Sequence, residues 1–114
     1  MRKLVIAAVV AAAAGAAHAG NPEAGKEKSR TCAACHGPDG NSAAADFPKL
    51  AGQHYDYLVK SLRDYKSGAR KNAIMAPLVA NLTERDFEDL AAFYSSQRGL
   101  VVRKNPYIVP SGKH

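Results

Sequence analysis

Cys32, Cys35 and His36 form the sequence C-A-A-C-H, and this motif constrains the chain more than any other feature. Two thiols three positions apart can add across the two vinyl groups of one haem and form two thioether bonds. The histidine that follows then lies under the iron, where its imidazole is a suitable proximal ligand. The motif therefore predicts one covalently attached haem c, bound through Cys32 and Cys35, with His36 on the iron.

Three other uses of the cysteines have to be weighed. An oxidising compartment would allow Cys32 and Cys35 to form a disulfide. A thiol redox site of the C-x-x-C type usually lies near a strand–helix–strand pattern, and none stands out in this sequence. A zinc site needs four ligands, whereas Cys32, Cys35 and His36 supply three. His54 is a candidate fourth ligand, but its spacing matches no standard zinc finger, so we favour the haem.

The first residues have the three-part pattern of a secretory leader. Arg2 and Lys3 form a basic start, and an uncharged run of apolar and small residues follows over positions 4–17. Ala17 and Ala19 place small residues at the two positions that a signal peptidase inspects. The run is shorter than the ~20 apolar residues that a membrane span needs. We therefore expect a leader over residues 1–19, cleavage after Ala19 and a periplasmic protein without stable membrane insertion. An uncleaved anchor is the alternative.

Length and charge limit the classes of protein further. A chain of 114 residues holds one domain, and at this size an apolar core alone is marginal. The formal charge is +6, and removal of Arg2 and Lys3 with the leader lowers it to +4. This small excess argues against nucleic-acid binding and fits a protein steered toward an acidic redox partner. Five cations are candidates for a basic rim near the haem edge, with an ordinary solvated surface as the equal alternative: Lys49, Lys60, Lys66, Arg70 and Lys71.

Three helices are predicted, and no strand pattern is present, which indicates an all-α fold. The first begins at Asn21, a cap residue followed by proline, and runs toward Arg30 or Cys32. The second has apolar residues at positions 55, 58, 59, 62 and 65, which share one helix face, and it ends at Gly68.

The third helix has the clearest start. Thr83 is a candidate N-cap, and Asp86 three residues later resembles the acidic half of a capping box. Gly99 is expected to end this helix. The segments 32–50 and 69–81 are rich in turn residues or lack periodicity, so both are predicted to be loops.

Met75 is the candidate for the sixth ligand of the iron. Apart from the initiator, it is the only methionine, and it lies 39 residues after His36 in an apolar stretch. A thioether is a soft, neutral ligand that favours ferrous iron and raises the reduction potential. His54 is the competitor and would give a bis-histidine haem. Tyr55 and Asn72 are candidates to donate to a haem propionate or to the sulfur of Met75.

With these residues assembled, the chain resembles class I cytochrome c, most of all the bacterial single-haem members related to the two-haem periplasmic cytochromes c. The matching segments, in addition to the haem motif, are Pro48 to Gln53, Met75 to Leu78, Asn81 to Thr83 and Tyr94 to Gln97. The resemblance implies the cytochrome c fold over residues 20–99, with three to four helices around one haem. Residues 100–114 would then be a C-terminal extension.

The resemblance also implies several contacts. Gly25 would pack against Phe93 or Tyr94 where the first and last helices cross. Pro48 would supply a carbonyl to His36, and Met75 would be the axial ligand. One departure is that Ser29 and Arg30 stand where the family usually has an aromatic residue.

The expected function is one-electron transfer in the periplasm, without enzymatic activity. Two side-chain ligands would occupy both axial positions, so the iron would change oxidation state without binding a substrate. One alternative is a haem subunit of a larger respiratory or dehydrogenase complex, in which the tail could be a contact segment. The other is a ligand-sensing or peroxidase-like haem protein, which would need an open sixth position and distal acid–base groups.

Overall fold

The computed structural model of the chain describes residues 2–9 and 19–100, and all of its helices lie between residues 22 and 96. The helices are α1 (Pro22–Lys28), α2 (Arg30–His36), α3 (Tyr55–Ser67), α4 (Met75–Val79) and α5 (Glu84–Ser96). The described residues contain no strand, so the all-α class is confirmed. Residues 10–18 of the expected leader and 101–114 of the expected extension lie outside the described residues.

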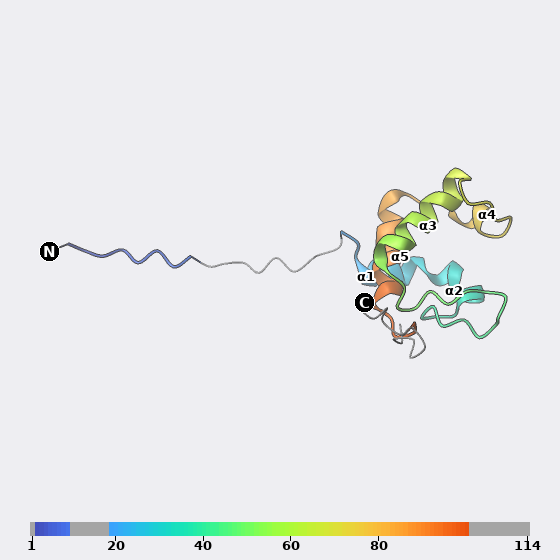
Figure 1. Ribbon diagram of the computed structural model, residues 1–114, viewed down its shortest axis with the longest axis horizontal. Coiled ribbons are helices and arrows are strands. Elements are labelled where there is room, and N and C mark those ends of the chain that lie inside the picture. The colour runs from blue at the N-terminus through green and yellow to red at the C-terminus, as the bar shows by residue number, and fades with distance from the viewer. Residues whose placement is uncertain (1, 10–18, 101–114) are drawn as a thin grey trace, which may run out of the picture.

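The contact between α1 and α5 is the most extensive between any two helices of the fold, and the two helices cross (Figure 1). Gly25 makes this crossing possible. A Cβ placed on Gly25 would overlap the backbone carbonyl of Asp89 and lie 2.8 Å from the Cβ of Phe93. The expected contact of Gly25 is therefore confirmed, and its aromatic partner is Phe93. The close approach explains a glycine inside a helix, where it otherwise costs ~1 kcal/mol.

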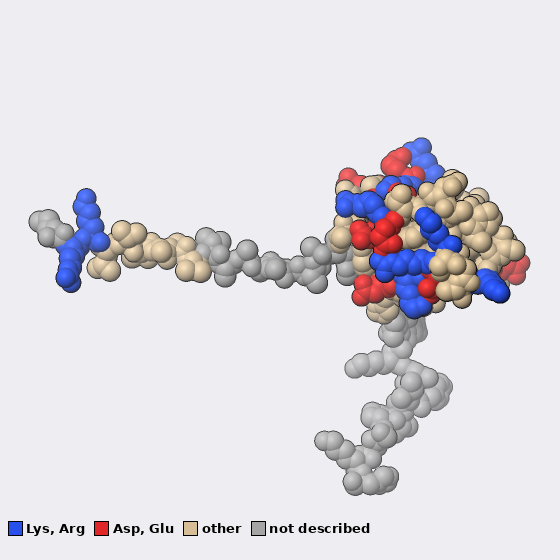
Figure 2. All heavy atoms as spheres, turned by 90° about the horizontal axis from the view of Figure 1, so that it is seen from above, with Lys and Arg blue, Asp and Glu red and all other residues tan. Residues whose placement is uncertain are grey.

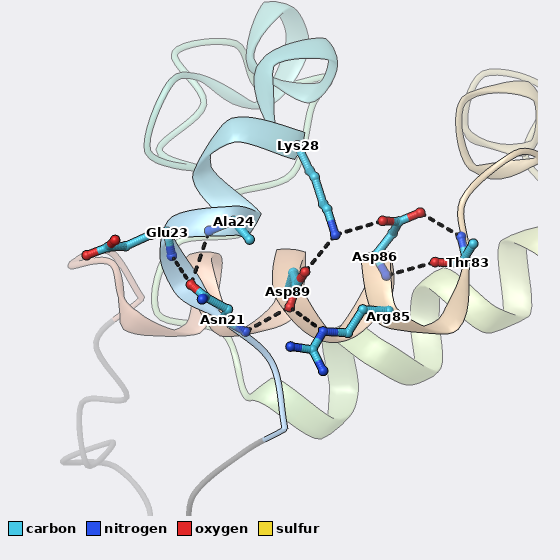
Figure 3. A network of polar contacts seen from close by, with 8 residues as sticks. All are labelled: Asn21, Glu23, Ala24, Lys28, Thr83, Arg85, Asp86 and Asp89. Carbon is cyan, nitrogen blue, oxygen red and sulfur yellow. Dashed lines mark hydrogen bonds and ion pairs between the residues drawn. The ribbon is translucent and has the colours of Figure 1, made fainter.

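A polar network fixes the start of α1 on α5 (Figure 3). The side chain of Asn21 accepts hydrogen bonds from the N–H groups of Glu23 and Ala24, which confirms its role as a cap. The N–H of Asn21 donates to the Asp89 carboxylate at 2.8 Å. Lys28 pairs with the same carboxylate at 2.6 Å, so both ends of α1 are tied to one buried acid.

The core lies between α3 and α5. Its buried members are Leu58 and Val59 of α3 together with Leu90, Ala91, Phe93 and Tyr94 of α5. The predicted apolar face of α3 is the face that packs here. Gly68 ends α3 with a positive φ of 83°, the left-handed cap that its position predicted.

Helix α5 begins as its sequence predicted and ends earlier. Thr83 accepts from the N–H of Asp86, and the Asp86 carboxylate accepts from the N–H of Thr83, so the capping box is complete. The helix ends at Ser96, with Gln97 as its C-cap, rather than at Gly99. Gly99 lies against Ala51 in the loop that precedes α3, so it serves a close contact between segments and not the end of the helix.

The described residues form five helices, where three to four were predicted. The seven-residue α2 extends into the predicted loop 32–50, and the five-residue α4 lies within the predicted loop 69–81. Segments this short show less than two turns of periodicity, so the pattern of apolar residues cannot reveal them. The first predicted helix is also interrupted at Ser29, which separates α1 from α2. No helix in the described part of the chain is long and apolar enough to cross a membrane.

Candidate haem-binding site

A cavity of about 400 Å³ lies at the end of the molecule where α2 and α4 face each other across the fold (Figure 1). Its size is within the ~300–1,000 Å³ range of cofactor sites. Side chains of α2, α3, α4 and α5 line it, and most of the lining is apolar. Cys32, Cys35, His36 and Met75 all belong to this lining. The four residues that the sequence singled out therefore meet at one cavity.

His36 is the last residue of α2 and is only 6% exposed. Its Nδ1 lies 2.8 Å from the carbonyl oxygen of Pro48. Because a carbonyl can only accept, Nδ1 carries the proton and donates, which leaves the lone pair of Nε2 for a metal. Phe47 contacts the imidazole edge to face, with 6.5 Å between ring centroids. These two contacts therefore already hold the imidazole in the orientation of a metal ligand.

The loop between α2 and α3 holds Pro48 in this position because it is bonded to itself and to α5. The carbonyl of Gly40 accepts from the N–H groups of Leu50 and Ala51, at 2.8 and 3.2 Å. The N–H of Gly52 donates to the carbonyl of Tyr94 at 2.9 Å. The position of the Pro48 carbonyl is therefore set by long-range contacts rather than by the two residues beside it.

Cys32 and Cys35 are one helical turn apart on α2, and both are free thiols that are partly buried. Positions i and i+3 of a helix share a face, so both sulfurs can reach the same ligand. A disulfide is not formed, which agrees with the choice made from the sequence. Within residues 2–9 and 19–100, no three His, Cys, Asp or Glu side chains are grouped so that they could hold a metal ion. The zinc alternative therefore finds no support.

Met75 is the first residue of α4 and is partly buried. Asn72 sets the start of this helix, since its side-chain oxygen accepts from the N–H groups of Ile74 and Met75, both at 2.9 Å. Asn72 also lines the cavity, and its side-chain nitrogen takes no part in these two bonds, so its role as a donor to the Met75 sulfur or to a propionate stays a prediction. Met75 is placed by a defined turn and not by a free loop.

His54 and Tyr55 lie away from the cavity. His54 is the exposed N-cap of α3 and is not among the residues that line the cavity. Its position therefore disfavours the bis-histidine alternative. Tyr55 does not line the cavity either, and its hydroxyl accepts a hydrogen bond from the backbone N–H of Gly20. The suggested contact of Tyr55 with a propionate or with Met75 is wrong.

Tyr94 was singled out from the sequence only as a packing partner, but it also lines the cavity. Burial raises the pKa of its phenol, and so does the nearby thiol of Cys32. Its hydroxyl is fully buried and makes no hydrogen bond of normal geometry to the described residues. The ring packs on Gly40, where a Cβ would lie 2.8 Å from the Tyr94 Cδ1. The sequence feature that could have indicated that Tyr94 lines the cavity is its position on the apolar face of α5.

The predicted rim of cations is only partly at the cavity. Lys49 and Arg70 line it, whereas Lys60, Lys66 and Lys71 do not. The guanidinium of Arg70 lies 4.7 Å from the centroid of the Tyr65 ring, which fixes it beside the opening. Lys60 is paired with Asp64. Figure 2 shows acidic and basic side chains interspersed over the face in view, so no field of one sign covers that face.

Comparison with known proteins agrees with this geometry. The family profile for Cytochrome c matches residues 22–97, which include the haem motif, the five helices and Met75. The chain therefore belongs to the cytochrome c family, whose members bind haem c covalently.

Individual relatives show which members of the family this chain resembles. The chain is 43% identical to cytochrome c4 of Pseudomonas aeruginosa over 99% of its own length and 57% of that protein. It is 45% identical to cytochrome c-554(548) of Halomonas halodenitrificans, over 69% of this chain and 99% of that one. The crystal structure of reduced cytochrome c4 from Pseudomonas stutzeri matches with a TM-score of 0.69 and 48% identity, over 73% of this chain and 48% of that one. The chain thus spans about half the length of the cytochromes c4 that it matches.

Proposed function

We propose that this chain is a periplasmic one-electron carrier with a single haem c. Cys32 and Cys35 would hold the haem through thioether bonds, and His36 and Met75 would ligate the iron. The observation that carries the proposal is that these four side chains line one apolar cavity, with the imidazole of His36 already oriented by the carbonyl of Pro48. The residues present therefore fit the group that the family binds.

The bound haem would supply a one-electron couple, and the protein would set its properties. The hydrogen bond from His36 Nδ1 to Pro48 makes the imidazole more basic and holds it in one orientation. The neutral thioether of Met75 favours the ferrous state, as does the apolar lining, which keeps water away. With side chains on both axial positions, no coordination site is left for a substrate, so we propose a carrier rather than an enzyme.

The haem count and the location are part of the proposal. The 114 residues contain two cysteines and hence one C-x-x-C-H motif, whereas the related cytochromes c4 carry two haems. The basic start and apolar run of residues 1–19 support export, and so does the periplasmic location of the relatives.

Replacing Met75 by alanine is expected to change the axial ligation without removing the haem. The absorption spectrum of the oxidised wild-type holoprotein should show six-coordinate low-spin iron with the weak long-wavelength sulfur-to-iron band. In the variant that band should be absent and the reduction potential should fall, because the soft ligand is lost. Intact mass should show one haem on each chain in both proteins.

Leu78→Ala is the matched control, since Leu78 lines the same cavity from the same helix and is 48% exposed. It should keep the sulfur-to-iron band. A wild-type spectrum that is high-spin, or a band that survives in Met75→Ala, would contradict the proposed ligand set and favour an open-site or bis-histidine haem.

We also propose that the redox partner is acidic where it meets the opening of the cavity. Lys49 and Arg70 are exposed cations at that opening, and Arg70 is held there by its contact with Tyr65. Opposite charges speed the encounter of two proteins at low salt. The exposed apolar side chains Tyr57, Ile74 and Leu78 line the same opening and would provide the contact itself.

Salt should therefore affect reactions with anionic and cationic reagents in opposite directions. Oxidation of the reduced holoprotein by ferricyanide, an anion, should slow as ionic strength rises, because added ions screen the local cations. A cationic cobalt complex should not show this slowing. Lys49→Gln with Arg70→Gln should flatten the ferricyanide response, whereas Lys26→Gln on α1 should not. If the ferricyanide rates of both variants respond to salt equally, the proposal of a local basic site at the opening is wrong.

A further inference from the structure

The first residues after the expected leader are packed onto α5. A Cβ placed on Gly20 would overlap the carbonyl of Glu88 and lie 3.0 Å from the Cβ of Ala92. Gly25 makes the same kind of contact further along α5, with Asp89 and Phe93. The N–H of Asn21 is also bonded to the buried Asp89 carboxylate (Figure 3). The packed domain therefore begins at Gly20 and not at the start of α1.

The residues before this point are different. Ala19 is exposed, and the apolar side chains among residues 2–9 are almost fully exposed, between 86% and 90% at Leu4, Val5, Ile6 and Val9. Figure 1 shows residues 2–9 far from the helices. The change from exposed to packed chain thus falls at the bond between Ala19 and Gly20, which is the bond that the leader pattern marks for cleavage.

The backbone nitrogen of Gly20 meets the hydroxyl of Tyr55, which has three carboxylates in its surroundings. Its N–H donates to the hydroxyl of Tyr55. Burial raises the pKa of that hydroxyl, and the carboxylates of Glu88, Asp56 and Asp89 raise it further, while the bond from Gly20 lowers it. Asp89 is paired with Lys28 and Arg85. Glu88 and Asp56 form no ion pair with any residue in the described ranges. Arg63 interacts with Glu88 electrostatically, but its guanidinium is already paired with Glu84, so a positive charge at Gly20 would still be attracted by both acids.

We propose that Tyr55 and Glu88 form a binding site for the amino terminus that cleavage after Ala19 releases. Hydrolysis of that peptide bond consumes one water, leaves a carboxylate on Ala19 and gives Gly20 an amine that takes up a proton. The ammonium then donates to the Tyr55 hydroxyl and is attracted by the Glu88 carboxylate. The inference rests on the export and cleavage proposed above, and it adds that cleavage stabilises the folded domain.

The sign of the pH dependence follows from this placement. The titratable and charged groups around the Tyr55 hydroxyl are Asp56 and Arg63 on α3, and Glu88, Asp89 and Arg85 on α5. The acids favour the charged amine, and the two arginines oppose it. Because Arg63 is paired with Glu84 and Arg85 with Asp89, the pKa of the amine in the folded protein should lie above the usual ~8 of a chain terminus. The added stability should be fully present below pH ~8 and be lost as the pH rises through the higher folded value.

The test compares two holoproteins that differ by one residue, one beginning at Gly20 and one that retains Ala19. Retaining Ala19 moves the ammonium away but keeps the N–H of Gly20. At pH 6 and low salt, the chain that begins at Gly20 should melt about 3 °C higher, a shift that corresponds to a fraction of a kcal/mol for a domain of this size. This difference in melting temperature, the gap between the two chains, should disappear at high pH. It should also disappear when both chains carry Glu88→Gln, and Tyr55→Phe should reduce it.

Glu27→Gln is the control, because Glu27 is an exposed acid on α1 paired only with Arg30 among the described residues. It should leave the gap unchanged. Equal melting temperatures of the two chains, or a gap that persists in Glu88→Gln, would overturn the site. The terminus of the exported protein is read separately from its intact mass, and a terminus other than Gly20 would also overturn the inference. Neither result would alter the haem spectrum, which tests the proposed function by itself.

Discussion

Gly25→Ala is expected to lower the free energy of unfolding of the holoprotein by at least about 3 kcal/mol. Helix propensity alone predicts the opposite, since alanine is a better helix former than glycine by ~1 kcal/mol. The steric term dominates here because the new methyl group would overlap the carbonyl of Asp89. That carbonyl is a backbone atom within a 13-residue helix, so it cannot move aside alone. Relief would require α1 and α5 to separate.

Gly68→Ala is the matched comparison for this prediction. Gly68 has a φ of 83°, and no heavy atom lies within 4 Å of the position that an added methyl group would take, so only backbone strain opposes the change. The expected cost is about 1–2 kcal/mol. Denaturant unfolding followed by circular dichroism would give both values. If Gly25→Ala proves as stable as the wild type, the helix crossing is not held by close backbone contact.

Local signals in the sequence were sufficient for several parts of the fold. The capping box at Thr83 and Asp86 and the left-handed end of α3 at Gly68 depend on residues within one turn of each other. The cap at Asn21 is of the same kind. In each case the side chain or the glycine satisfies a requirement of the adjacent backbone, so no knowledge of the tertiary structure is needed.

Helix α4 was missed because its five residues, with Pro77 among them, are too few to show a period, although Asn72 fixes its start from only three positions before Met75. The other parts that were missed depend on distant contacts. Gly99 looked like a helix end but packs on Ala51, which is 48 positions earlier in the chain. Tyr55 looked like a residue of the haem site, yet its hydroxyl meets Gly20. Local sequence carries no information about which of these partners lies near.

The candidate site was predicted more completely than the fold. The chemistry of thioether attachment fixes the spacing of Cys32, Cys35 and His36 within one short segment. Met75 could be named because only one methionine remains after the initiator. The bond between His36 and Pro48 came from the family resemblance, because the loop that brings them together is held by contacts to α5. The resemblance supplied long-range information that periodicity cannot.

Asp89→Asn is expected to destabilise the holoprotein by about 2–3 kcal/mol at neutral pH. Asp89 is 2% exposed, accepts hydrogen bonds from the N–H of Asn21 and from Lys28, and forms an ion pair with Arg85 at 3.3 Å. Replacing the buried carboxylate by a neutral amide removes the charge that these groups share. The cost is below the ~3–5 kcal/mol of fully buried pairs because the Lys28 side chain is 31% exposed and can regain water.

The same carboxylate should make the wild-type protein sensitive to acid. Burial alone raises the pKa of Asp89, but the hydrogen bond from Asn21 and the charge of Lys28 hold it below the ordinary value of 3.8. Lys28 and the N–H of Thr83 also lower the pKa of Asp86. Groups with a depressed folded pKa stabilise the protein above their ordinary pKa, and this stability is lost as the pH falls through the folded value.

Thermal unfolding between pH 7 and pH 2 would measure this effect. The stability of the wild type should fall steeply below pH ~4. Asp89→Asn should be less stable at neutral pH and lose less stability in acid, so the plots of stability against pH for the two proteins should converge. Glu27→Gln removes an exposed acid and should follow the wild-type curve within ~0.5 kcal/mol. Curves for wild type and Asp89→Asn that stay parallel to pH 2 would mean that Asp89 acts through packing rather than through its charge. The link between α1 and α5 would then depend on packing at Gly25 and Asp89 and on the ion pair of Lys28 with Asp86.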